Sequence, residues 1–164
     1  MLIVQKRIAL QPHADTELRL AFEQRRKARQ RTVLVTGEEV ALFLDRGMIL
    51  HGGDCLLSDD GRVVRIVAAP EALMEVKSDD AGVLARAAYH LGNRHCPVEI
   101  GEGMLRFPAD HVLAEMLLGM GLAVTSISAP FEPEAGAYAA GHHHSSEAKH
   151  AGIIHDFAQR GPSR

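Results

Sequence analysis

Four histidines lie within nine positions near the carboxyl end of the chain, in the stretch "GHHHSSEAKH" at 141–150. They are His142, His143, His144 and His150. Imidazole nitrogens are ligands that suit nickel, copper or zinc, whereas magnesium and calcium prefer oxygen ligands. A purification tag is a poor explanation, because only three of the histidines are consecutive and ordinary sequence follows them. The stretch therefore predicts metal binding of moderate affinity with easy release.

Two further histidines stand at the ends of expected helices. His95 follows the end of the first helix and precedes Cys96 and Pro97, so its side chain is held by the fold without being committed to the core. His111 lies in the first turn of the second helix, opposite the apolar stripe, where the helix dipole disfavours imidazolium and leaves the nitrogen free. Either residue alone is more simply explained as a surface histidine. We predict that His95, His111 and the four tail histidines are metal ligands.

The remaining histidines carry less weight. His90 lies at the flank of its helix and is assigned to packing or solvent, and His13 and His51 have no companions. His155, within "GIIHDF", is assigned to a short docking segment.

The two cysteines, Cys55 and Cys96, are far apart in sequence and are expected to remain thiols in a reducing compartment. Cys96 is a candidate soft ligand, although a buried small side chain is the favoured reading.

Composition and motifs argue against several classes of function. The net charge of −3 provides no general field for nucleic acids or acidic membranes. No apolar run approaches the ~20 residues that span a bilayer, and the opening lacks a basic leader, so we expect a cytoplasmic protein. The chain has no nucleophile elbow, phosphate loop, dinucleotide fingerprint or Cys-x-x-Cys pair, so we expect that it is not an enzyme.

The first 70 residues show short runs of strand character. These runs are "LIVQKRIAL", "TVLVT", "EVALFL", "DCLLS" and "RVVRIV", and the "DDG" at 59–61 predicts a hairpin between the last two. The basic segment "EQRRKARQRT" at 23–32 could bind phosphate, but no aromatic residues interleave with its charges, which favours a solvated loop and strand start. We predict an all-β domain over residues 1–70.

Two amphipathic helices follow Pro70. Their apolar stripes fall at the same spacing: Val83, Leu84, Ala87, Ala88 and Leu91 in the first helix, and Val112, Leu113, Met116, Leu117 and Met120 in the second. Asp79 or Asp80 can cap the first helix and Asp110 the second, and Gly92 and Gly121 mark their ends.

Strand candidates surround these helices at 73–78, 97–101, 104–108 and 123–128. The resulting order, β-α-β-β-α-β, predicts a ferredoxin-like domain over residues 71–130, with both helices on one face of an antiparallel sheet. From 131 to 164, Pro, Gly, Ala, Ser and His dominate, which predicts a flexible histidine-containing tail. The expected fold class is α+β.

Several segments resemble one protein family in their order and spacing. "AAYHLGNRH" at 87–95, "DHVLAEMLLGMGL" at 110–122, "FEPEAGAY" at 131–138 and the histidine-rich end are similar to the nickel metallochaperone of urease maturation, the accessory protein usually lettered E. The resemblance covers almost the whole chain. It implies a homodimer formed through the second domain, which can pair into a tetramer with metal, and delivery of Ni(II) as cargo to apo-urease. The implied partners are the urease accessory GTPase and the apo-urease activation complex.

The resemblance also implies roles for individual residues. His95 ends the "GNRH" motif, whose histidine lies near the dimer two-fold axis in the family, so that each subunit gives one ligand to a shared metal. His111 matches a histidine that some members use as an additional site, but the position two before it, histidine in some members, is Ala109 here. The tail histidines would complete the shared site.

Two alternatives remain open at this point. Imidazole sites also take Zn(II) and Cu(II), so a zinc- or copper-buffering protein fits the same ligands. A peptide- or RNA-binding adaptor, in which the β-rich domain or the basic segment does the work, would make the histidines incidental.

Overall fold

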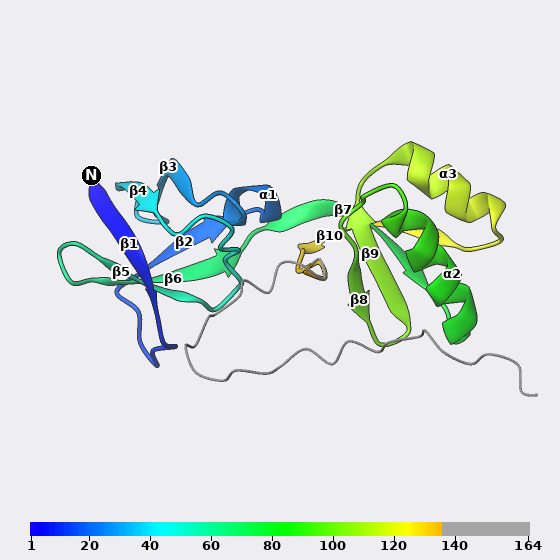
Figure 1. Ribbon diagram of the computed structural model, residues 1–164, viewed down its shortest axis with the longest axis horizontal. Helices are drawn as coiled ribbons and strands as arrows, with labels where there is room; N and C mark the ends of the chain where they lie inside the picture. The colour runs from blue at the N-terminus through cyan, green and yellow to red at the C-terminus, as the bar shows by residue number, and fades with distance from the viewer. Residues whose placement is uncertain (136–164) are drawn as a thin grey trace, which may run out of the picture.

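The computed structural model describes residues 1–135 and has two units, each built on its own sheet (Figure 1). The first sheet has six strands in the order β2-β6-β5-β1-β4-β3, and the second has four in the order β10-β7-β9-β8. Helices pack against the second sheet, which confirms the predicted α+β class.

The first unit contains six strands and one short helix. Their bounds are β1 Leu2–Ile8, β2 Thr16–Leu20, α1 Phe22–Arg25, β3 Arg29–Val33, β4 Glu39–Phe43, β5 Cys55–Ser58 and β6 Val63–Ala68. Leucine, valine and isoleucine side chains from these strands and from the segments between them form one buried cluster. The hairpin predicted at "DDG" is confirmed, since β5 and β6 pair antiparallel and Gly61 takes the positive φ that this turn requires.

The second unit follows after the single residue Ala69. Its elements are β7 Pro70–Lys77, α2 Ala81–Gly92, β8 Glu99–Gly101, β9 Met104–Pro108, α3 His111–Gly119 and β10 Val124–Pro130. This is the predicted β-α-β-β-α-β order, and its strand pairs are all antiparallel. Figure 1 shows α2 and α3 on the side of this sheet that faces away from the first unit.

The two long helices begin at the predicted aspartates. Asp80 Oδ1 accepts hydrogen bonds from the backbone N–H groups of Gly82 and Val83, and Asp110 Oδ1 does the same for Val112 and Leu113. These bonds satisfy backbone donors that have no partner within the helix. The two caps therefore fix where α2 and α3 begin.

The apolar stripe predicted for α3 is partly wrong. Val112 is 58% exposed and Met120 is 37% exposed, whereas Ala114 and Leu117 are buried against the sheet. Apolar residues occur on nearly every side of α3, so spacing alone allows more than one stripe, and packing selects the one through Ala114.

The basic segment at 23–32 is also not simply a solvated loop. Part of it forms α1, and β3 starts at Arg29. Arg25 is fully buried at the junction of the two units. The strand β2 was not predicted either, although its side chains alternate between buried and exposed.

The predicted flexible tail begins at 131, but its first residues belong to the folded structure. Phe131 is 1% exposed, and the backbone N–H groups of Glu132 and Glu134 donate to Glu99 Oε2 and to the Val98 carbonyl. The expectation of mobility therefore fails for residues 131–134, and residues 136–164 lie outside the described residues. Within residues 1–135, none of the helices has the length and apolar character to cross a bilayer.

Candidate metal-binding site

His95 lies in the turn that ends α2. The His95 N–H donates to the Gly92 carbonyl at 2.9 Å, and the Cys96 N–H reaches back to the Leu91 carbonyl at 3.3 Å. These bonds hold His95 in the left-handed region, with φ of 55°, which is unusual for a residue other than glycine. Such a conformation costs on the order of 1–3 kcal/mol and is held by the surrounding structure. The turn leaves the His95 residue exposed to solvent.

His111 is the first residue of α3 and directly follows the capping residue Asp110. It is also exposed, as expected from the sequence. The histidine thus stands at the positive end of the α3 helix dipole.

Cys96 follows His95 in the turn and is partly buried. Burial raises the pKa of the Cys96 thiol, and the negative charge of Asp110 raises it further. The raised pKa favours the Cys96 thiol over the thiolate. The thiolate is the form that binds metal.

Within residues 1–135, His95 and His111 do not belong to a complete metal site. Among residues 1–135, no group of three or more His, Cys, Asp or Glu side chains is arranged to hold a metal ion. The predicted ligands His142, His143, His144 and His150 lie outside the described residues, as does His155. The described structure therefore offers exposed single imidazoles that need donors from elsewhere.

The other histidines are placed differently from one another. His90 is half-buried, and its ring makes an edge contact with Tyr89, with 5.4 Å between the ring centroids. His13 is exposed. His51 does have a companion, contrary to expectation, because its Nδ1 lies 3.0 Å from Glu132 Oε2.

No sequence signal could have revealed that pair. His51 and Glu132 are 81 residues apart, and they meet only because β10 pairs with β7 along its whole length and ends beside the first unit. Arg25 joins them, since its Nη1 lies 2.9 Å from Glu132 Oε2.

Phe22, the aromatic residue that directly precedes the basic segment, does not offer its ring to bases. It is buried against Phe131, with 5.5 Å between ring centroids. The guanidinium groups of Arg25 and Arg26 lie over the Phe22 ring at 5.6 and 5.7 Å. The aromatic face is therefore occupied by the protein's own cations.

Models of protein families match both units of the chain. The model described as "UreE urease accessory protein, N-terminal domain" matches residues 3–69, and its C-terminal counterpart matches residues 71–158.

Similar full-length proteins carry the same name. The chain is 48% identical to "Urease accessory protein UreE" from Azotobacter vinelandii, with 98% of this chain and 99% of the relative covered. A protein of the same name from Pseudomonas fluorescens is also 48% identical, with the same coverage. The relative from Burkholderia vietnamiensis is 55% identical over 82% of this chain and 67% of its own length. The chain therefore belongs to the UreE urease accessory protein family.

Proposed function

We propose that this protein is a metallochaperone that binds Ni(II) as cargo and delivers it to apo-urease while the urease active site is assembled. The observation that carries the proposal is the exposed imidazole of His95, held in a left-handed turn, in a chain of the urease accessory family. The protein acts as a carrier and not as an enzyme. Its partners are the urease accessory GTPase and the apo-urease activation complex, in the cytoplasm, without nucleic acid or membrane.

The metal site is shared between two chains of a homodimer. One His95 cannot saturate an ion, and within residues 1–135 it is not part of any group of three or more donors that could hold a metal ion. Two copies related by a two-fold axis would bring two His95 side chains to one ion. His111 and the tail histidines His142, His143, His144 and His150 would fill the remaining positions.

Exposed apolar side chains on the second unit support the dimer. They are Tyr89, Ile100, Val112, Leu118 and Met120, each between 37% and 66% exposed. A partner chain would remove such surface from water, at roughly 25 cal/mol per Å² of apolar area. Metal binding would then allow two dimers to pair into a tetramer.

A site of this kind suits a carrier. Imidazoles donated by separate segments bind a borderline divalent ion but can leave one at a time, so the metal passes to another site by ligand exchange. The same ligands take Zn(II) and Cu(II) in vitro, and a zinc- or copper-buffering role is the main alternative. The family assignment favours nickel, since the relatives are named as accessory proteins of urease, the enzyme to which we propose that the metal is delivered.

Activation of apo-urease at limiting nickel tests the proposal. Wild-type protein is expected to raise the yield of active urease. His95→Ala protein is expected to give no more active urease than an assay to which neither protein is added. Urease activity in the presence of the accessory GTPase is the measurement, with His13→Ala as the matched histidine control. Full activation by a variant that lacks His95 and all tail histidines would instead support an adaptor that works without binding metal.

A further inference from the structure

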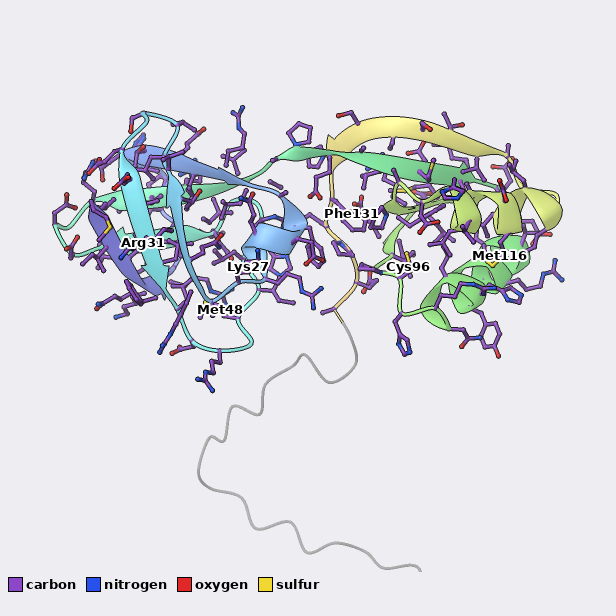
Figure 2. The ribbon with its side chains drawn as sticks, turned by 90° about the horizontal axis from the view of Figure 1, so that it is seen from above. Lys27, Arg31, Met48, Cys96, Met116 and Phe131 are labelled. Atoms are coloured by element: carbon purple, nitrogen blue, oxygen red, sulfur yellow. The ribbon has the colours of Figure 1, made fainter. Side chains whose placement is uncertain are left out.

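Residues 131–134 form a strap that runs from the end of β10 to the start of β8 and touches both units. Because β10 is antiparallel to β7 and Pro130 pairs with Pro70, β10 ends where the chain passes from one unit to the other. Figure 2 shows Phe131 at this junction. The strap is also the last described segment before the histidine-bearing tail.

The strap is bound to the first unit by a buried cation. Arg25, with no exposed surface, donates through Nη1 to the Leu50 carbonyl at 3.0 Å and through Nη2 to the Phe131 carbonyl. Nη1 also lies 2.9 Å from Glu132 Oε2. A buried guanidinium that loses its carboxylate is left as an uncompensated charge, so this pair strongly favours one position of the strap.

Two other groups of the first unit hold the same carboxylate. The Gly52 N–H donates to Glu132 Oε1 at 2.8 Å, and His51 Nδ1 lies 3.0 Å from Oε2. Burial on its own would raise the pKa of Glu132, but the hydrogen bonds from Gly52, His51 and Arg25 outweigh it and bring the pKa below the usual carboxyl range. The side chain is therefore held as a carboxylate at neutral pH.

The backbone of the strap is bound to the second unit. The Glu132 N–H donates to Glu99 Oε2 at 2.9 Å, and Glu99 is itself held by Arg106. The Glu134 N–H donates to the Val98 carbonyl at 2.8 Å. Val98 is three residues after His95 in the sequence, so the strap ends beside the segment that carries the proposed ligand.

We propose that Arg25 and Glu132 are positioning residues that anchor the root of the tail beside the His95 segment. This inference rests on the proposed function. It gives the first unit a part in metal binding, because that unit supplies Arg25, Gly52 and His51 to the anchor. The first tail histidine, His142, follows the anchored Glu134 by eight residues, a stretch that reaches at most about 29 Å when extended.

Anchoring raises the local concentration of the tail imidazoles at His95. If the strap is released, the tail is held only from Pro130, and the tether to His142 grows from eight to twelve residues. A longer tether with a displaced root changes the effective concentration of the tail histidines at His95. Release of the strap takes the root of the tail away from the His95 segment and should therefore weaken the tail-dependent nickel binding.

The test compares Glu132→Gln with Glu134→Gln in the full chain. Both substitutions remove one negative charge from the strap, but the side chain of Glu134 is exposed, whereas that of Glu132 is held by the first unit. Hydrogen exchange of residues 131–135 is measured without metal, and NiCl2 is then titrated by calorimetry. Arg25→Met serves as a second variant that removes the buried charge from the other side.

Glu132→Gln and Arg25→Met are expected to speed exchange of the strap by roughly tenfold and to weaken the tail-dependent nickel events, while Glu134→Gln changes neither. Exchange in the β9 peptide 104–108 should stay at the wild-type rate, which shows that the second unit is folded. If the strap of Glu132→Gln exchanges at the wild-type rate, Glu132 does not anchor the strap. If the strap exchanges faster but nickel binding stays at the wild-type level, the anchor has no positioning role in metal binding. If the wild type takes up no nickel, the proposed function is contradicted, and so is the positioning role. The hydrogen-exchange result would still show whether Arg25 and Glu132 anchor the strap.

Discussion

Replacing His95 with alanine is expected to remove the tightest nickel-binding event of the dimer. If each subunit contributes His95 to one ion, a single substitution in the chain removes two ligands from the assembled site. The expected loss is large because the remaining imidazoles come from His111 and from the tail. Calorimetric titration of NiCl2 into wild-type and His95→Ala protein measures it directly.

The conformation of His95 calls for a second variant. Its φ of 55° is less favourable for alanine than for asparagine, which tolerates the left-handed region. His95→Asn should therefore keep the turn while removing the imidazole, and it should lose the same binding event. His13→Ala is the control, since His13 is exposed and remote from the turn in sequence, whereas His51 contacts Glu132 and would disturb the strap.

Light scattering must accompany these titrations, because a variant that no longer dimerises would lose the site for a structural reason. An intact dimer that keeps its tight nickel event in both His95 variants would refute the assignment. The primary site would then move to the tail histidines.

Replacing Phe107 with alanine is expected to destabilise the protein by about 3–5 kcal/mol. Phe107 on β9 is fully buried in the cluster between the second sheet and its helices, where it packs with residues such as Leu91 and Leu117. The substitution removes the ring from a site that can collapse only partly, so a cavity remains. Thermal unfolding should shift downward by roughly 6–20 °C for a chain of this length.

Phe43 provides the matched control for Phe107. It is also a phenylalanine, but it belongs to neither buried cluster and is 48% exposed. Phe43→Ala should cost about 1 kcal/mol, because roughly half of a phenylalanine's burial is lost. Equal destabilisation by the two substitutions, measured by urea unfolding, would contradict the assignment of Phe107 to the core of the second unit.

The sequence was sufficient to predict the second unit in detail because its signals are local. The aspartates at 80 and 110 are followed by helical spacing of apolar residues, and both cap their helices as expected. The four strands between and around the helices fall close to the predicted ranges. With two helices and four strands in this order, few compact arrangements remain, so the topology could be predicted without knowledge of any contact.

Features that depend on distant contacts could not be predicted. The strand Thr16–Leu20 contains Glu, Leu and Arg, which are not strong strand formers, and it is stabilised by parallel pairing with β6. Arg25 lies in a basic run that reads as a solvated surface, yet it is buried because Glu132 and two carbonyl groups meet it there. Glu132 and the Phe131 carbonyl reach Arg25 only when β10 has paired with β7.

In the candidate site, too, the features that depend on local signals could be predicted and those that depend on distant contacts could not. The positions of His95 after α2 and of His111 at the start of α3 could be read from helix boundaries, and both residues are exposed as expected. The partner of His51 could not be read from the sequence, because Glu132 reaches it across the junction. The ligand set around a bound ion remains a prediction, since the proposed ligands come from a second chain and from residues beyond 135.

The number of tight nickel ions per chain tests the shared site most directly. Native mass spectrometry of metal-stripped protein loaded with increasing nickel should first populate a species of two chains and one nickel ion. The same measurement on His95→Asn protein should show two chains without that ion at equal nickel concentration. A first species with one nickel ion on each chain, or a monomer that holds the ion alone, would contradict a site built from two His95 side chains.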